Sequence, residues 1–325
     1  MIAAVALESL AGTLRASRGL AAKRDIGLAT ARLGISGASA VAVGDDCAAI
    51  PDGDGYLLLA IEGFMNEFVA GDPWFAGWCG VMVNISDIAA MGGRPLAVVD
   101  ALWADGTENA APVLAGMHAA SERFGVPVVG GHTNLRTDRG QLSVAILGRA
   151  KRLLTSFDAK PGDRLIAAID LRGRYREPFS NWEAATDAPA ERLRGDLELL
   201  PAIAEAGLSR AAKDISQGGI VGTAAMFAEC SGVGVAIDLA AIPRPDGVAL
   251  ERWLLTFPSF GYLLAAPPVN AAEIIASFMG RGIAAADIGA VTGGSLITIG
   301  EGGATVPIWD VAEAPLLGCG PKALI

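Results

Sequence analysis

The stretch DPWFAGWCGVMVNISDIAAMGGR, residues 72–94, decides the fold that we expect for this chain. As a helix over Trp74–Met91, at roughly 100° per residue, it gathers its large apolar side chains in one arc about 120° wide. Gly80, Asn84 and Asp87 fall on a neighbouring stripe, at spacings of four and three residues. The arc predicts a helix packed in a core. The stripe is either a polar face that meets water or one side of a binding site.

Both ends of this helix are marked in the sequence. Asp72 followed by Pro73 is typical of a helix start, because proline suits the first helical position and aspartate can cap the free N–H groups. Gly92-Gly93 predicts the stop.

Composition excludes several classes of protein. The chain has 325 residues, 52% of them hydrophobic, which suffices for two domains with a core each. Its net charge of −10 argues against nucleic acid or an anionic membrane as the main partner, since both require clustered lysine and arginine. An anionic ligand would therefore need metal ions or local donors.

Nothing in the sequence predicts export or a membrane span. Apolar runs stop well short of the ~18 residues that a spanning helix needs. In the opening segment Glu8 lies inside the apolar run and the arginines follow it, the reverse of a secretory signal. The four cysteines form no CxxC pair, which favours reduced thiols and a cytoplasmic location.

Strand patterns alternate with helix patterns along the whole chain, which predicts a protein of the α+β class built of α/β layers. The charged, Pro-Gly-punctuated stretch KRLLTSFDAKPGDRL divides two such series. We therefore expect two domains, residues 1–155 and 156–325.

Carboxylates and glycine-rich turns recur at expected strand ends. Asp45 and Asp46 follow Gly44, and there they can hold a hard cation or simply form a turn. Glu62 ends an apolar strand, and a carboxylate at that position indicates a site more strongly than a carboxylate in a polar loop does. Asp214 would lie just outside the start of a helix for which Ser216 is the expected N-cap and Gly232 the stop.

Three further segments are candidate binding elements, and two of them have two readings each. Gly130-Gly131-His132-Thr133 is expected as a turn after a strand, either one that approaches a phosphate or a plain tight turn. Gly218 and Gly219 permit close approach of a ligand to helix N–H groups. The loop RGRYREPFSNW, with Arg174, Arg176 and Trp182, is either a clamp for an anionic or planar group or a solvated excursion.

Absent motifs narrow the chemistry. The sequence contains no Gly-Lys pair and hence no Walker A loop. With only His118 and His132, neither near a serine elbow, a hydrolase triad is improbable. Carboxylates beside glycine turns suit a nucleotide bound with Mg²⁺, which prefers one or two carboxylates plus phosphate oxygens.

Four segments, in this order, closely resemble the signature segments of the aminoimidazole ribonucleotide (AIR) synthetase superfamily, which includes thiamine-monophosphate kinase and selenophosphate synthetase. They are GDDCAAIP (44–51), NISDIAAMGGRP (84–95), VVGGHT (128–133) and KDISQGGI (213–220). The Arg172–Trp182 loop and the stretch from Ile61 to Val81 look most like the AIR-synthase-related proteins of undefined function.

The resemblance implies a two-domain fold, in which the N-terminal domain contributes strands to the β-barrel of a homodimer and the C-terminal domain is α+β. It also implies ATP and Mg²⁺ as cofactors. By position, the resemblance identifies Asp45, Asp46, Asp87 and Asp214 as metal- and phosphate-binding acids. Asn84, Gly130, Gly131, His132 and Thr133 match segments that border the nucleotide, and Lys23 is matched to an N-terminal lysine of some members.

The chain departs from the superfamily pattern in two places. Glu62 stands where the strand usually ends in a metal-binding aspartate, so that the longer side chain either shifts the metal or loses it as a ligand. No cysteine precedes Cys47, which argues against selenide chemistry.

The resulting hypothesis is an ATP- and Mg²⁺-dependent kinase or synthetase. It transfers a phosphoryl group to, or activates, an oxygen of a small molecule, and its substrate contacts are expected from Arg174, Arg176, Trp182, Ser216, Gly218 and Gly219. The alternative is a nucleotide-binding partner or regulatory subunit without turnover. A third possibility is a purely structural α/β dimer.

Overall fold

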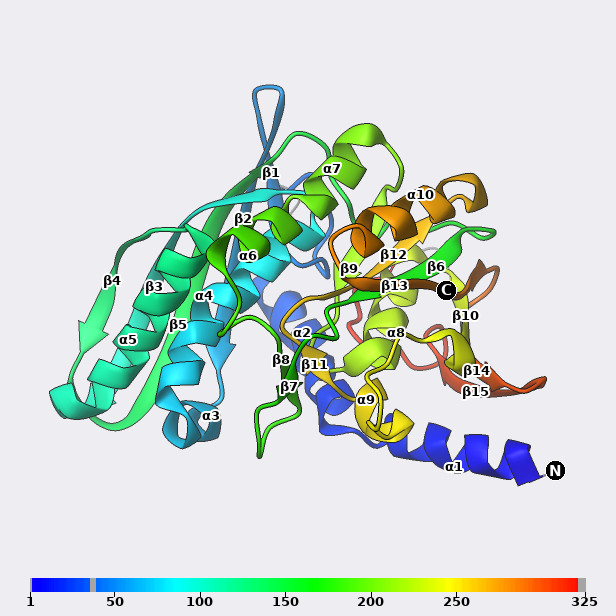
Figure 1. Cartoon of the computed structure of the whole chain (residues 1–325), viewed down its shortest axis with the longest axis horizontal. Helices are drawn as coiled ribbons and strands as arrows, with labels where there is room; N and C mark the ends of the chain where they lie inside the picture. The colour runs from blue at the N-terminus through cyan, green and yellow to red at the C-terminus, as the bar shows by residue number, and fades with distance from the viewer. Residues whose placement is uncertain (1, 36–38, 321–325) are drawn as a thin grey trace. The chain divides into compact units, whose positions relative to one another are not determined.

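The computed structural model describes residues 2–35 and 39–320 (Figure 1). The chain forms two compact units, and both are assembled from separate stretches of sequence. The five-stranded unit comprises Cys47–Leu153 and Thr186–Ala202. The seven-stranded unit comprises Met1–Asp46, Leu154–Ala185 and Ile203–Ile325. The expected pair of domains, residues 1–155 and 156–325, stays a prediction.

The five-stranded unit is a sheet in the order β1-β2-β5-β3-β4. Its strands are β1 (Ala48–Asp52), β2 (Gly55–Phe64), β3 (Arg94–Asp105), β4 (Val128–Asn134) and β5 (Arg136–Ala150). All neighbours are antiparallel except β3 and β4. The helices of this unit are α3 (Asn66–Gly71), α4 (Pro73–Ala90), α5 (Gly106–Phe124) and α6 (Ala190–Leu197), followed by α7 (Leu199–Ala206) at its border.

The helix α4 confirms the expectation for the opening stretch. Its N-cap is Asp72, whose carboxylate accepts a hydrogen bond from Phe75 N at 3.2 Å, and Pro73 occupies the first turn. Beyond Met91 the chain leaves the helix through Gly92, at φ 73°. Trp78, Val81, Met82, Ile85, Ile88 and Ala89 are all buried. The predicted core arc is therefore correct except at its first residue, Trp74, which is only partly buried.

Helices α4 and α5 pack backbone to backbone. A Cβ at Gly77 would lie 2.0 Å from Val113 O, and one at Gly116 would lie 1.9 Å from Trp74 O. Since no side chain fits at either position, the two glycines fix how closely the helices approach. Gly80, by contrast, faces Val144 of β5, which holds α4 against the sheet.

The seven-stranded unit has a sheet in the order β15-β14-β10-β13-β6-β12-β9. Its strands are β6 (Arg164–Ile169), β9 (Ala211–Asp214), β10 (Gly234–Asp238), β12 (Gly261–Ala266), β13 (Ala284–Thr292), β14 (Leu296–Glu301) and β15 (Ala304–Asp310). Its helices are α1 (Ile2–Arg15), α2 (Arg18–Leu33), α8 (Gly219–Ser231), α9 (Leu250–Leu254) and α10 (Pro268–Met279), with the 3₁₀ turn η1 (Leu239–Ala241).

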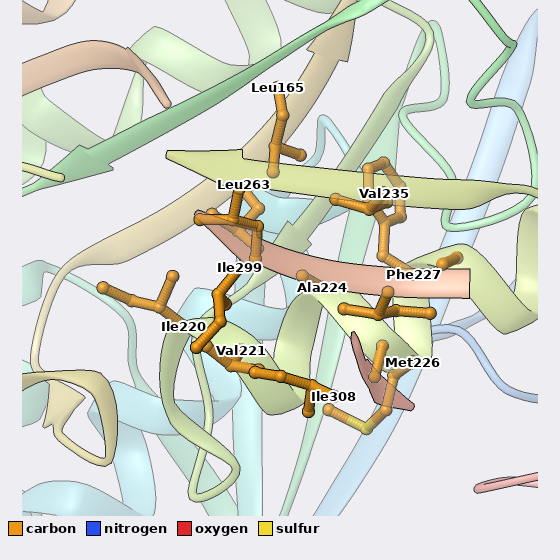
Figure 2. Packing of buried hydrophobic residues seen from close by; sticks show 14 of the residues in the cluster. Leu165, Ile220, Val221, Ala224, Met226, Phe227, Val235, Leu263, Ile299 and Ile308 are labelled. Atoms are coloured by element: carbon orange, nitrogen blue, oxygen red, sulfur yellow. The ribbon is translucent and has the colours of Figure 1, made fainter. Parts of the chain in front are cut away.

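The core of this unit lies between α8 and the sheet. Figure 2 shows Ile220, Val221 and Ala224 of α8 gathered with side chains from the strands, among them Leu263 and Ile299. Helix α8 is buried from Gly219 to Cys230, as expected for a helix with no charged residue before Glu229. Each unit thus layers helices on a mainly antiparallel sheet, so the predicted α+β class is confirmed.

Three local expectations are wrong. The 130–133 segment is not a turn, because β4 continues to Asn134 and pairs Gly131 with Asp100 of β3. Ser216 is not the N-cap of α8, since the helix begins at Gly219 and the Ser216 carbonyl accepts from Gly219 N at 2.8 Å. The end of α8 at Gly232, in the left-handed region, is as predicted.

The third error concerns the arginine-rich loop after β6. It forms β7 (Arg174–Tyr175) and β8 (Asn181–Glu183), which join β11 (Phe257–Pro258) in a three-stranded sheet. Trp182 is buried there, packs edge-on against Trp253, and donates its indole N–H to Asp170 O at 3.1 Å. Aromatic packing, which composition conceals, places Trp182 in the core, whereas Arg174, Glu177 and Pro178 of the same stretch are exposed.

No helix in the described ranges is both long and apolar enough to cross a membrane.

Candidate functional site

Acidic side chains and one lysine meet inside the seven-stranded unit. Asp46 lies in the connection between α2 and β1, whereas Lys213 and Asp214 are the last two residues of the buried strand β9. The Lys213 ammonium forms an ion pair with Asp46 Oδ1, and both side chains are at most 6% exposed. Asp46 Oδ2 accepts a hydrogen bond from Asp214 N at 3.3 Å. The strand end and the loop are thereby joined by a buried charge pair.

Asp46 and Asp214 present carboxylate oxygens to the same place. A ligand oxygen of each lies within 4.8 Å of the other, and Asp214 is only 5% exposed. Two carboxylates at this separation match the oxygen-only donor set that Mg²⁺ prefers, with phosphate or water completing the shell. The residues present therefore fit a hard divalent cation.

Asp45 has a different environment from Asp46, although the two are adjacent. Its Oδ2 accepts from Ser156 N at 2.9 Å and its Oδ1 from Ser156 Oγ at 2.6 Å. Burial, reinforced by the Asp46 charge and opposed by Lys213 and Ser156, raises the pKa of Asp45 to about 6. Asp45 thus ties its loop to the 154–158 turn.

Lys213 is the residue of this site that sequence reasoning missed. Burial alone would lower the pKa of its ammonium, but the carboxylates of Asp46, Asp45 and Asp214 outweigh burial and raise it. Lysine is almost never fully buried unless it is paired. A lysine within the apolar strand pattern AAKDI was the available signal, since it implies a buried acid nearby.

In the five-stranded unit, the polar stripe of α4 is buried. Asn84 and Asp87 are 0% and 5% exposed, so this stripe does not form the open, water-facing side of a surface helix. Asn84 Nδ2 donates to Gly80 O at 2.8 Å. Its Oδ1 has no hydrogen-bond partner among the residues that the structure describes. An orphaned buried acceptor of this kind is typical of a position that awaits a ligand or water.

Glu62 lies in a row that crosses the same sheet. Glu62 of β2 and Asp100 of β3 both pair with Val144 of β5, and Asp100 pairs in turn with Gly131 of β4. Val144 contacts Gly80 of α4, so the row lies on the helix-covered face. Because neighbouring strands lie about 4.8 Å apart, the backbones of Glu62 and Asp100 are about 10 Å from each other across the row.

Asp100 is an acid whose place beside Gly131 the sequence did not reveal. Its Oδ1 would lie 2.2 Å from a Cβ at Gly131, and its Oδ2 is buried without a partner among the described residues. Burial raises the pKa of Asp100. Only glycine fits beside this carboxyl, which gives a packing reason for the second glycine of the 130–133 segment.

The remaining candidates are dispersed. His132 and Thr133 are exposed on the edge strand β4, and Lys23 is half-buried on α2. Arg174 lies on β7 and is exposed, Arg176 follows it and is partly buried, and Trp182 is in the core. The Ser216 Oγ is buried without a partner in the described part of the chain, just before Gly218 and Gly219. Functional roles for these residues stay predictions.

Fold and site together define an α+β protein with a paired-carboxylate site at a strand end. Its sequence matches the family models for the AIR synthase related protein, N-terminal domain, over residues 44–150, and the AIR synthase related protein, C-terminal domain, over residues 161–300. The chain therefore belongs to the AIR synthase related family, as its signature segments predicted.

Relatives show how far the similarity extends. Uncharacterized protein sll0787 of Synechocystis is 49% identical over 94% of this chain and 96% of its own length. Thiamine-monophosphate kinase of Methanospirillum hungatei is 31% identical over 65% of this chain and 75% of its own. T. maritima PurL complexed with ATP has the same fold, with a TM-score of 0.71 at 20% identity, covering 85% of this chain and 46% of that one.

Proposed function

We propose that this protein is an ATP- and Mg²⁺-dependent enzyme that transfers a phosphoryl group to, or activates, an oxygen atom of a small molecule. The observation that carries the proposal is the buried pair Asp46–Asp214, whose carboxylates approach within 4.8 Å at the end of β9. Membership of the family and the names of two relatives, a thiamine-monophosphate kinase and a PurL bound to ATP, support it.

In this proposal Asp46 and Asp214 hold the cation. Asp87 and Glu62 of the five-stranded unit keep the metal-binding role that the family resemblance implies for their positions. Bound Mg²⁺ would neutralise charge on the ATP phosphates. Asp45 is assigned a positioning role, since Ser156 already occupies both of its oxygens. Lys213 restrains Asp46 and offsets the repulsion between neighbouring acids.

The nucleotide is assigned to the orphaned Oδ1 of Asn84, the 130–133 segment and Lys23. The substrate is assigned to Arg174, Arg176 and the Ser216–Gly219 segment, where the buried Ser216 Oγ has no hydrogen-bond partner among the described residues and could bond a ligand oxygen. Trp182 supports this region from the core, because its indole N–H already bonds Asp170 O.

Phosphoryl transfer requires little covalent chemistry from the protein. Catalysis comes mainly from positioning the reactants in line and from stabilising charge. Acids, amides and close backbone therefore suffice, and no side-chain nucleophile is needed.

A panel of phosphate-acceptor and amide substrates tests the enzymatic half of the proposal through ADP release. The expected result is release with at least one substrate, abolished by EDTA and reduced at least 100-fold in Asp214→Asn. Tight ATP binding without ADP release across the panel would reject turnover and leave the alternative, a nucleotide-binding partner subunit. One observation favours that alternative. The Lys213 ammonium is paired with Asp46 and so already supplies the positive charge that a bound cation would supply.

We also assign a homodimer to the open face of the five-stranded sheet. Val144 and Gly148 face α4, and Leu58 pairs with Gly148. On the opposite face, Leu59 and Ile61 are 47% and 69% exposed. Leu59 pairs with Leu147 across the sheet, so these side chains form one patch. An apolar patch on a sheet face marks an interaction site, and the strands of a second copy, forming a barrel, would cover it. The four free cysteines suit the cytoplasmic location we assign.

A further inference from the structure

Two thiols flank the Gly44 backbone in the seven-stranded unit. Cys230 belongs to the last turn of α8, and Cys319 to the segment after β15. A Cβ at Gly44 would lie 3.2 Å from Cys230 Sγ and 3.6 Å from Cys319 Sγ. Gly44 has φ 122°, a value that L side chains rarely adopt. The missing side chain therefore leaves one small space that both sulfur atoms face.

A buried carboxylate holds the second thiol in place. Glu229, the residue before Cys230, accepts hydrogen bonds from Leu316 N at 2.5 Å, Leu317 N at 2.9 Å and Cys319 N at 3.1 Å. Glu229 is 4% exposed, and Leu316 and Leu317 are buried. Three backbone N–H groups donate to one buried carboxylate and fix residues 316–319 against α8. These hydrogen bonds hold Cys319 near Cys230.

The two thiols differ in access. Cys230 is 1% exposed, whereas Cys319 is only partly buried. Cys47 and Cys79, the other cysteines, are buried in the five-stranded unit. The pair thus contains one cysteine with partial access to solvent, Cys319, and one that is closed to solvent, Cys230.

We infer that Cys230 and Cys319 are a modification site, at which a peroxide produces a reversible intramolecular disulfide. The Cys319 thiolate attacks one peroxide oxygen, the O–O bond breaks, and with one proton the products are Cys319 sulfenic acid and water (for hydrogen peroxide). The Cys230 thiolate then attacks the sulfenic sulfur and displaces hydroxide, which leaves as water after protonation. Two thiols are oxidised and one peroxide is reduced. For the bond to form, Cys319 must turn toward Cys230, since sulfur atoms in a disulfide are about 2 Å apart.

The site is coupled to the acid cluster through the backbone. Gly44 precedes Asp45 and Asp46, and the Cys230 thiol donates to Gly44 O at 3.6 Å. Oxidation removes this S–H donor and links α8 to the segment after β15, the two elements whose cysteines lie beside Gly44. Burial raises the pKa of both thiols, so the reaction is expected to be slow at neutral pH and to accelerate as pH rises.

Peptide mapping of the full chain tests the inference. Reduced protein is treated with a small excess of hydrogen peroxide, alkylated with iodoacetamide and digested without reductant. The expected result is a linked pair of peptides containing Cys230 and Cys319, with two of the four thiols lost and dithiothreitol restoring both. Recovery of both cysteines as alkylated thiols, or of Cys319 as sulfinic acid, would overturn the inference, as would a bond between two chains.

Two variants provide matched controls. Cys79→Ala should retain the linked peptide. Cys319→Ala should lack the linked peptide, and its thiols should not disappear two at a time on treatment with peroxide. Because a cross-link restricts the unfolded chain, peroxide should also raise the Tm of wild type but not of Cys319→Ala. An equal rise in both proteins would exclude this disulfide as its cause. Neither readout depends on ATP or on turnover.

Discussion

At the scale of single residues, Lys213 controls the acid cluster. The substitution Lys213→Met leaves Asp46 buried without its counter-charge and should lower the free energy of unfolding by about 3–5 kcal/mol, measured by urea unfolding in EDTA. Mg²⁺ should restore more stability to this variant than to wild type, because the cation supplies the missing positive charge.

The control for this substitution is the double variant Asp46→Asn/Lys213→Met. Because both charges of the pair are removed together, the double variant should be more stable than Lys213→Met alone. A double variant with additive losses would show that the ion pair contributes nothing.

Asp45 predicts a pH dependence in the metal-free protein. Its pKa in the folded chain, about 6, exceeds the ordinary value of 3.8. Between these pH values the folded chain binds more protons than the unfolded one, so ionisation of Asp45 lowers the free energy of unfolding as pH rises from 4 to 6. Asn at this position does not titrate. The stability of wild type relative to Asp45→Asn should therefore fall by on the order of 2 kcal/mol across this window in urea unfolding. A constant difference would contradict the assigned environment.

At the scale of secondary-structure elements, the contact of α4 with α5 makes a sharp prediction. Gly116→Ala places a Cβ 1.9 Å from Trp74 O, and overpacking of this kind should cost about 1–3 kcal/mol despite the better helix propensity of alanine. Gly12→Ala on α1 is the matched control: no atom lies within 4 Å of the new Cβ, so it should gain up to about 1 kcal/mol. Thermal unfolding of both variants decides the question, and equal effects would contradict the packing.

The elements themselves were largely predictable, because apolar periodicity and end signals act locally. The limits of α4 at Asp72 and Gly92 followed from capping and from glycine geometry. The 130–133 segment was mistaken for a turn because its strand character comes from pairing with β3, a partner far away in sequence. Trp182 was placed in a polar loop for the same reason, since Trp253 and Tyr175 make it part of the core.

The site was predictable in kind but not in detail. Acids at strand ends indicated a cation, yet sequence could not separate Asp45 from its neighbour Asp46. Their difference arises from Ser156 and Lys213, which are distant in sequence from both. Asp100 was hidden for the same reason, because only strand pairing places it beside Gly131.

At the scale of the whole molecule, the assigned homodimer makes the sheet face testable. Ile61→Asp puts a charge on the open face of the five-stranded sheet, where a second copy would bury it, and should convert a dimer into a monomer in sedimentation velocity. Val269→Asp, at an even more exposed residue of α10 (87% against 69%), should leave the dimer intact. A monomeric wild type at micromolar concentration, or a dimeric Ile61→Asp, would reject this interface.

The central claim is that the acids at the end of β9 bind a magnesium nucleotide. Isothermal titration of ATP in Mg²⁺ and in EDTA, with wild type and Asp214→Asn, measures it most directly. Circular dichroism first establishes that the variant is folded. The account predicts binding to wild type that requires Mg²⁺ and is weakened at least tenfold in Asp214→Asn, a loss of about 1.4 kcal/mol or more. Equal affinities of the two proteins, or binding indifferent to Mg²⁺, would contradict it.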